Sequence, residues 1–404
     1  MGFSKKRIYM DFASATPLHA QVKKEMVDTF ALFGNPSAPH EEGRRAKEKL
    51  ESARVRIART LGVKSSNLFV TGSGTESNNL ALFGFVDALI VRGAQPSALH
   101  IITSGFEHPS ADDPMTVIEK RGVRVTRVLP NEEGVITPER VREHITPQTV
   151  LVSIVATQSE IGVVQPLKDI ATMLADVQNK RGQTTQALVP ETALPVFHTD
   201  ASQSPLFLDL SPERLGVGMA SYDAQKCMGP KGVGLLYKDS SIPLEPFIRG
   251  GKQERGIRPG TENVVGVAGM ARAFELSKEK RKERVARVSQ VRDFFFELLE
   301  KEVPEAEING SKKKRIANNV HISLPNTDGD YLAVLMDKKG IAVSPRSACI
   351  ASGVPSRTVV SLGKNEASAI GTLRFTLSPD VSKKDVRQAI KVLKKVIAIT
   401  TRGI

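Results

Sequence analysis

The chain has 404 residues, of which 40% are hydrophobic and 25% are charged, as is usual for a globular protein large enough for two or three domains. Its formal net charge of +13 allows a nucleic-acid or acidic partner. Most of the basic residues alternate with acidic ones, however, and the chain contains no Trp. We therefore expect a solvated surface and no direct nucleic-acid binding.

No apolar run approaches the roughly 18 residues that cross a membrane, and no apolar segment follows the basic N-terminus. We therefore expect neither a membrane partner nor a signal peptide. The only two cysteines are Cys227 and Cys349. They are too few for a disulfide framework or a cysteine-rich metal site, so we expect no metal and a reducing, cytoplasmic setting.

Hydrophobic periodicity and turn residues predict an α/β chain in which strands and helices alternate. The predicted strands are 8–12, 67–71, 100–104, 123–129, 150–156, 196–199, 317–323, 341–343 and 372–377. The predicted helices are 19–33, 41–60, one that follows residue 79, 138–145, 167–180, 264–301, 328–339 and 382–398. Residues 182–195 form a polar surface excursion. The alternation favours a mostly parallel, doubly wound sheet, followed by a smaller α+β domain.

A Gly/Ser/Thr turn at 72–79 joins the strand at 67–71 to the helix after it. Backbone N–H groups at such a helix start are able to cradle a phosphate. The turn is neither a Walker loop nor a dinucleotide-binding glycine loop, because it lacks the closing Gly-Lys-Ser/Thr and a third glycine. A capped helix with no ligand explains the pattern equally well.

Lys226 precedes a glycine-rich turn and an apolar strand, and Asp200 ends an earlier strand. A desolvated lysine tends to lose its proton or to react covalently. A lysine for a Schiff base and a carboxylate for a pyridinium nitrogen are what pyridoxal phosphate (PLP) requires. Most lysines are nevertheless solvated side chains, so this pair gains weight only from the rest of the sequence.

Two further residues have side chains suited to catalysis. His108 lies just past the strand at 100–104, where open α/β sheets place their ligands, although a lone histidine is more often structural. Cys349 lies in a loop of small residues at 344–353. A thiol in such a loop is able to move and react, although an inert thiol is the commoner case.

Taken in order, the motifs of the chain resemble those of the PLP-dependent cysteine desulfurases of the NifS and IscS type, within the class V aminotransferases. The resemblance covers nearly the whole chain. It rests on residues 9–11, 33–36, 74–80, 107–108, 160–165, 200–204, 226, 229–234, 254–261, 347–349 and 374–376. It implies the PLP-dependent transferase fold of the aspartate aminotransferase type, with a mostly parallel sheet of the seven-stranded type.

The resemblance also implies roles around the cofactor ring. Lys226 would hold PLP as a Schiff base and move the Cα proton. Asp200 would pair with the pyridinium nitrogen, and Gln203 would hydrogen-bond the phenolic oxygen of the ring. His108 would stack on the ring and act as an acid or base toward the substrate.

At the phosphate, the resemblance assigns Gly74, Thr75 and Gln225, with Thr261 contributed by a second subunit. Two positions here depart from the family, which usually has histidine where Gln225 stands and serine where Asp223 stands. Gln225 is still able to donate a hydrogen bond. A carboxylate at position 223 would repel a phosphate dianion unless it turned away or met a cation. A third departure is Gln158-Ser159, which replaces a pair of asparagines.

The implied substrate is L-cysteine. Arg374 would bind its carboxylate, and Asn35 would also contact it. Cys349 would attack the substrate sulfur as a thiolate, keep it as a persulfide and leave alanine. The implied domains are a large PLP-binding domain at 16–262 and a small α+β domain, formed by 1–15 and 263–404, that carries the cysteine loop.

The resemblance further implies a homodimer and a protein that accepts the sulfur. That acceptor is an iron–sulfur scaffold, a tRNA thiolation enzyme or another thio-cofactor pathway. Two other functions stay open at this point. One is a related class V enzyme such as a selenocysteine lyase. The other is a regulatory or binding homologue that has lost tight PLP binding, which the departures at Asp223, Gln225 and Ser159 suggest.

Overall fold

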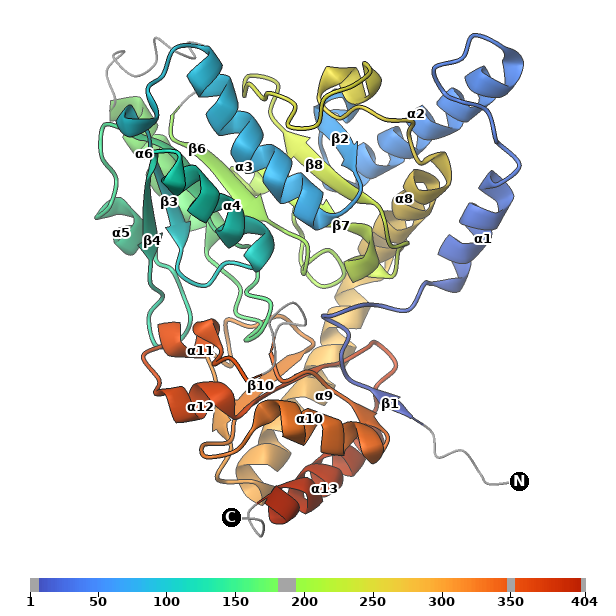
Figure 1. Cartoon of the computed structure of the whole chain (residues 1–404). Helices are drawn as coiled ribbons and strands as arrows, with labels where there is room; N and C mark the ends of the chain where they lie inside the picture. Colours follow the sequence, from blue (N-terminus) through green and yellow to red (C-terminus); the bar gives the residue numbers. More distant parts are fainter. Residues whose placement is uncertain (1–6, 181–193, 347–352, 401–404) are drawn as a thin grey trace.

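The computed structural model describes residues 7–180, 194–346 and 353–400. Cys349 and almost all of the surface excursion predicted at 182–195 lie outside these residues. Two parts are visible in Figure 1, a large one built on a seven-stranded sheet and a smaller one below it. Within the described residues, no helix combines the length and the apolar character needed to cross a membrane.

The large sheet confirms the predicted mostly parallel arrangement. Its strand order is β2-β8-β7-β6-β5-β3-β4, and only β8 runs antiparallel to its neighbours. The strands are β2 (Leu68–Thr71), β3 (His100–Ser104), β4 (Arg124–Val128), β5 (Thr149–Ser153), β6 (Val196–Asp200), β7 (Met219–Asp223) and β8 (Gly234–Lys238). Most of these strands are buried on both faces, as expected for a parallel sheet covered by helices.

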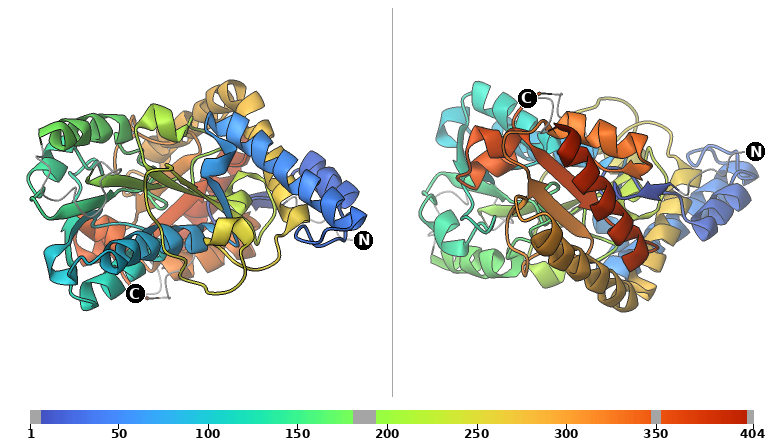
Figure 2. Two further views of the ribbon diagram at one scale, coloured as in Figure 1. Left: turned by 90° about the horizontal axis from the view of Figure 1, so that it is seen from above. Right: turned by 90° about the horizontal axis from the view of Figure 1, so that it is seen from below.

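Helices cover both faces of this sheet, which Figure 2 shows from above. On one face, α3 (Gly74–Val91) and α4 (Pro109–Lys120) pack apolar side chains such as Phe85 and Met115 against the strands. On the other face lie α2 (Glu41–Leu61), α6 (Leu167–Lys180) and α8 (Val264–Glu279). The short helices α5 (Pro138–Arg142) and α7 (Pro212–Leu215) lie in the connections.

The smaller part is built on an antiparallel sheet in which β10 (Asn319–Ser323) lies between β12 (Thr372–Thr376) and β9 (Glu307–Ile308). Its helices are α9 (Arg281–Glu302), α10 (Gly329–Lys338), α11 (Arg357–Ser361), α12 (Glu366–Ile370) and α13 (Lys383–Thr400). The N-terminal strand β1 (Ile8–Tyr9) pairs in parallel with β11 (Ile341–Ala342), so the start of the chain lies beside this part. The domain boundaries at 15/16 and 262/263 stay a prediction.

The connection between the parts is where the predicted elements differ most from the structure. The helix predicted at 264–301 is two helices, because α8 ends at Glu279 and α9 begins at Arg281. Lys280 between them leaves helical geometry, with φ −110° and ψ 17°. The surrounding residues are all charged, so no interruption of an apolar pattern marks the break.

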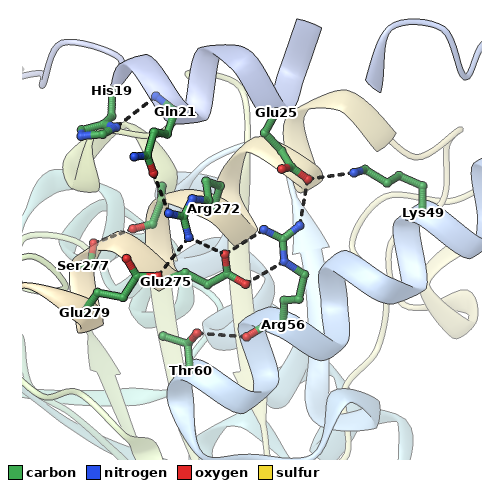
Figure 3. A network of polar contacts seen from close by, with 11 residues as sticks. His19, Gln21, Glu25, Lys49, Arg56, Thr60, Arg272, Glu275, Ser277 and Glu279 are labelled. Atoms are coloured by element: carbon green, nitrogen blue, oxygen red, sulfur yellow. Dashed lines mark hydrogen bonds and ion pairs between the residues drawn. The ribbon is translucent and has the colours of Figure 1, made fainter. Parts of the chain in front are cut away.

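An arm formed by α1 (Ala20–Thr29) and α2 is joined to α8 by a network of polar contacts, drawn in Figure 3. Arg56 on α2 donates to both carboxylate oxygens of Glu275 on α8, at 2.7 and 2.8 Å, and to Glu25 on α1 at 2.8 Å. Lys49 also donates to Glu25, at 2.8 Å. The bond to Glu275 is the largest cause that raises the pKa of Arg56 above its usual value. The network therefore fixes the direction in which the arm leaves the sheet.

Candidate active site

One pocket lies where the carboxyl ends of β6 and β7 meet the first turns of α3 and α4. The carboxyl edge of a parallel sheet is the expected place for a ligand. The lining residues are Gly74, Thr75, His108, Ser110, Val155, Thr157, Ser159, Asp200, Ser202, Gln203, Asp223, Gln225 and Lys226. The seven residues predicted around the cofactor ring and phosphate within one subunit are all among them, although they come from four separate stretches of sequence.

A wider hollow of about 560 Å³ lies between α6 and β8. Its lining includes Gln178 and Val196, which stand close to the two ends of the undescribed segment 181–193. It contains none of the predicted site residues, so we place no site there.

Lys226 lies in a short 3-10 turn (Ala224–Cys227) directly after β7. Its Nζ donates to the carbonyl oxygens of Ala13 at 2.6 Å and Ser14 at 2.8 Å, and the side chain is half-buried. The turn ends at Met228, whose positive φ of 62° reverses the chain toward β8. Thr16 supports this turn by accepting from the backbone N–H of Met228 at 2.8 Å. The predicted tight turn into a buried strand is confirmed.

Asp200 is the last residue of β6, and two donors hold its carboxylate. The backbone N–H of Ser202 donates to Oδ1 at 2.9 Å, and Nδ2 of Asn78 donates to Oδ2 at 2.9 Å. The same Asn78 amide donates to Oγ of Ser110 at 2.9 Å. Asn78 is fully buried one turn into α3, so it sets the orientation of the carboxylate from below the pocket.

His108 caps the start of α4, and its ring is held by the residue two positions on. The backbone N–H of Ser110 donates to Nδ1 of His108 at 3.1 Å, so the neutral ring carries its proton on Nε2. Burial lowers the pKa of His108 below its usual value; Lys226 and Arg374 lower it further, while Asp200 opposes this. The imidazole is therefore neutral at pH 7 and offers an Nε2–H to the pocket.

Arg374 on β12 reaches from the small part toward the pocket, and only 2% of its side chain is exposed. Its guanidinium donates to Oδ1 of Asp11 at 3.0 Å, to Oγ of Ser14 at 2.7 Å and to the carbonyl of Ser159 at 2.9 Å. Arg374 does not line the pocket itself, but Ser159 does. Its predicted role toward a substrate carboxylate stays a prediction.

The predicted phosphate end of the pocket is the first turn of α3. Ser73 caps the helix by accepting from the N–H of Glu76 at 3.1 Å. A Cβ at position 74 would lie 2.7 Å from Oγ of Ser202, so a larger residue would force that side chain to move. The N–H of Gly74 donates to Oδ2 of Asp223 at 3.2 Å. Asp223 therefore turns toward the helix start and not away from it.

The donors and acceptors of this pocket fit PLP at its reactive end. Lys226 supplies an amine, Asp200 a carboxylate oriented by two N–H groups, and His108 a neutral ring on the same side. Gln203, which donates to the carbonyl of Ala13 at 3.0 Å, stands beside them. At the other end, the helix start and Thr75 suit a phosphate, although Asp223 adds a negative charge there.

Besides Arg374, three predicted residues are not in this pocket. Asn35 and Thr261 are exposed and do not line it within one chain, and Cys349 lies outside the described residues. Conversely, Asn78 and Ser110, to which the sequence analysis assigned no role, hold Asp200 and His108. Asn78 belongs to the motif at 74–80, but nothing in its local sequence marks it as the partner of Asp200.

Gln158, which departs from the family pattern, does not reach the pocket. Its Nε2 donates to the carbonyl of Phe106 at 3.2 Å and to Oγ1 of Thr358 at 2.8 Å. Its Oε1 accepts from the N–H groups of Glu160 and Ile161. It therefore joins a loop of the large part to α11 of the small part.

Comparison with known proteins places these observations in a family. A profile described as aminotransferase class-V matches residues 8–389. The chain is 33% identical over 395 residues to the cysteine desulfurase IscS of Dictyoglomus turgidum, with 97% of this chain and 95% of that protein covered. It is 34% identical over 397 residues to the cysteine desulfurase IscS of Histophilus somni strain 129Pt, with 96% and 92% covered.

Solved structures that are similar to this chain point to the same family. A NifS-like protein superposes with a TM-score of 0.85 and 30% identity, over 97% of this chain and 100% of that one. A structure of SspA in complex with cysteine superposes with a TM-score of 0.74 and 30% identity, over 92% and 99%. With the lysine, carboxylate and histidine of the pocket in place, the chain belongs to the aminotransferase class-V family, among its PLP-dependent cysteine desulfurases of the IscS and NifS type.

Proposed function

We propose that this chain removes the sulfur atom of L-cysteine, releases L-alanine and carries the sulfur as a persulfide on Cys349. One observation carries the proposal. Lys226, Asp200 and His108, from three distant stretches of sequence, line one pocket. The cysteine desulfurases to which the chain is similar over nearly its whole length, and the cysteine bound to the similar SspA structure, support this choice of substrate.

Bound PLP supplies an electron sink that makes the Cα–H bond of an attached amino acid acidic. Lys226 would hold PLP covalently through Nζ, and its amine, once released, would take the Cα proton. Asp200, held by Ser202 and Asn78, would keep its carboxylate on the ring nitrogen. The two donors fix this carboxylate before the cofactor binds, so no reorganisation is needed.

His108 and Arg374 would act on the substrate. The neutral imidazole offers an Nε2–H, which would donate a hydrogen bond to the substrate. Arg374 would bind the substrate carboxylate with its guanidinium, in exchange for part of its contacts with Asp11 and Ser14. A carboxylate that replaced Asp11 would keep this buried cation paired.

The sulfur step uses Cys349 as a thiolate. Its sulfur forms an S–S bond with the substrate sulfur while the C–S bond breaks. The electron pair of that bond stays with the carbon skeleton, which takes up a proton and leaves as alanine. The persulfide then passes its outer sulfur to the thiol of an acceptor protein.

The test compares Cys349→Ala with Cys227→Ala after both proteins are loaded with PLP. Cys227 is buried, and burial raises the pKa of its thiol, so it is a matched cysteine without a nucleophilic role. We expect Cys349→Ala to lose alanine and sulfide formation by about 100-fold or more, while Cys227→Ala keeps them. Equal activity of Cys349→Ala and the parent protein would overturn the assignment of the nucleophile.

Two alternatives are separated from this function by experiment. A selenocysteine lyase would use the same pocket, and side-by-side turnover of cysteine and selenocysteine separates the two activities. A homologue with weak PLP binding is favoured by Asp223, whose carboxylate occupies the phosphate end. A protein that stays colourless after incubation with PLP would support this second alternative, and stoichiometric binding would exclude it.

We also propose that the chain acts as a homodimer and delivers sulfur to an acceptor protein. Thr261 is exposed within one chain and lies outside the pocket. A second subunit would bring its own Thr261 to the phosphate end. The acceptor belongs to iron–sulfur cluster assembly, tRNA thiolation or another thio-cofactor pathway, and pull-down of persulfide-transfer partners would distinguish these.

A further inference from the structure

Asp223 is a buried carboxylate at the phosphate end of the pocket, and its two oxygens are already in use. Oδ2 accepts from the N–H of Gly74 at 3.2 Å and from Nε2 of Gln225 at 3.2 Å. Oδ1 accepts from the N–H of Gln225 at 3.0 Å. Only 6% of the residue is exposed. The carboxylate is therefore part of the pocket wall and is held there by three donors.

The donors that Asp223 uses are those that suit a phosphate. Gly74 begins α3, an 18-residue helix whose N-terminus attracts negative charge. The N–H of Glu76 in the same turn is taken by the Ser73 side chain, and that of Ser77 by the Ser73 carbonyl. The N–H of Gly74 points at Asp223 and not at an open site, so of the first-turn amides only that of Thr75 is left for a ligand.

Positive charge around the start of α3 does not offset the negative charge of Asp223. Apart from the neutral His108, Lys226 is the one basic side chain among the pocket-lining residues that the structure describes. Its amine would be consumed by the covalent link to PLP. Arg258, which lies beside this turn, is bound to Glu76 at 2.7 Å. A phosphate at the start of α3 would thus meet two acceptor oxygens and no unpaired cation among these groups.

We propose that Asp223 competes with the phosphate group of PLP for the N-terminus of α3. This inference rests on the proposed function and concerns how its cofactor is held. The ring end of the pocket then supplies most of the affinity, and the phosphate adds little. The chain should accordingly discriminate weakly between PLP and pyridoxal, which has the same ring and aldehyde without the phosphate.

The experiment measures binding and not turnover. Protein freed of cofactor is titrated with PLP and, separately, with pyridoxal, and equilibrium dialysis gives both dissociation constants. We expect Asp223→Ser to bind PLP about tenfold more tightly than the parent and to bind pyridoxal equally well. Asp223→Asn keeps an acceptor oxygen and removes the charge, so its affinity for PLP should lie between those of the parent and Asp223→Ser. It serves as the test if the serine variant folds poorly.

Asp328→Ser is the matched control, because Asp328 also caps a helix, α10, by accepting from two backbone N–H groups far along the chain. Its PLP and pyridoxal constants should equal those of the parent. An unchanged ratio of the two constants in both Asp223 variants would overturn the inference while leaving the proposed function intact. Absence of any PLP bound covalently at Lys226, in every variant, would overturn the proposed function and the inference with it.

Discussion

Glu107 is a buried carboxyl group beside the pocket, and its ionisation should affect stability. Burial raises its pKa from 4.5 to about 8, although hydrogen bonds from the Ser104 hydroxyl and the Val155 N–H oppose this. Between these pH values the folded chain binds a proton that the unfolded chain has lost. Stability from this group is therefore complete below pH 4.5 and is lost as pH rises through about 8.

Glu107→Gln is neutral at every pH, so it isolates this contribution. From about pH 5 to about pH 9, we expect the parent to lose on the order of 4 kcal/mol of unfolding free energy relative to the variant. Urea unfolding at each pH measures the difference, and other titrating groups cancel because both proteins share them. Glu132→Gln, at an exposed carboxyl, should follow the parent. If the difference in unfolding free energy between the parent and Glu107→Gln stays constant with pH, the raised pKa of Glu107 is refuted.

At the scale of residues, the sequence identified the residues with reactive groups better than the residues that hold them in place. Lys226 and Asp200 were identifiable because each ends or follows a strand and carries a reactive group. Asn78 and Ser110 were not, because their role is to hold Asp200 and His108 across chain distances of 122 and 2 residues. The bond from Asn78 depends on how β6 and α3 pack, which no local pattern encodes, and Ser110 in turn accepts from the Asn78 amide.

At the scale of elements, α10 holds the two described ends of the cysteine loop. Oδ2 of Asp330, in the first turn of α10, accepts from Nη2 of Arg346 at 2.7 Å and from the N–H of Gly353 at 2.9 Å. Arg346 is 2% exposed, so its charge needs this partner. Because Cys349 lies between Arg346 and Gly353 in sequence, one carboxylate sets where its loop begins and ends.

Asp330→Ala should release both ends of that loop. We expect the rate of sulfur transfer by Cys349 to fall about tenfold while PLP binding is unchanged, at a stability cost of about 2 kcal/mol because the carboxylate is partly exposed. Alkylation of Cys349, followed by mass spectrometry, should also change in rate, which a purely structural role elsewhere would not produce. Asp330→Glu should restore part of the activity.

The control for this element is Asp337→Ala, on the same helix. Asp337 pairs with Arg7 at the surface, and more than half of each side chain is exposed. Exposed pairs contribute little, so transfer and alkylation rates should match the parent. If both variants behave alike, the contact of Asp330 with the loop ends has no part in positioning Cys349.

Which elements could be predicted depended on how distinct their local patterns were. β3 and α6 match their predicted ranges because short apolar strands and an amphipathic helix leave clear patterns. α4 was missed, because Pro114 stands inside it and proline normally argues against a helix interior. The antiparallel direction of β8 was also unpredicted, since strand direction follows from tertiary connection and not from sequence periodicity.

At the scale of the whole molecule, the loop that carries Thr261 is tied to the arm. Both guanidinium nitrogens of Arg54 on α2 donate to the carboxylate of Glu254, at 2.7 and 2.8 Å, and all but about 3% of both side chains is buried. Glu254 also accepts from the N–H of Val70 at the edge of the large sheet. The Arg54–Glu254 pair therefore holds the loop that carries Thr261 in a fixed position relative to the arm. A partner subunit that binds the arm would meet this loop in that position.

The end of the arm has the character of an interface. Phe30 and Phe33, between α1 and α2, are 66% and 83% exposed, although large aromatic side chains are normally buried. Figure 1 shows this connection projecting away from both sheets. An exposed aromatic pair on a rigid projection fits a second copy of the chain, which would bury it by symmetry. Sequence periodicity predicted a helix at 19–33, but α1 ends at Thr29, so both residues lie after the helix, and periodicity could not show that they face solvent.

We therefore expect the parent to be a dimer and the double variant Phe30→Ser, Phe33→Ser to dissociate at least about tenfold more readily, because two hydrophobic anchors are removed. Sedimentation equilibrium measures the dimer dissociation constants of the parent and of the double variant. The control is Val91→Ser at the end of α3, which removes a 70% exposed apolar side chain away from the arm and should leave the dimer intact. If Thr261 of the partner subunit reaches the phosphate end, the dissociated variant should also bind PLP more weakly but pyridoxal equally well. A monomeric parent, or a variant that dimerises as the parent does, would exclude the arm as the interface.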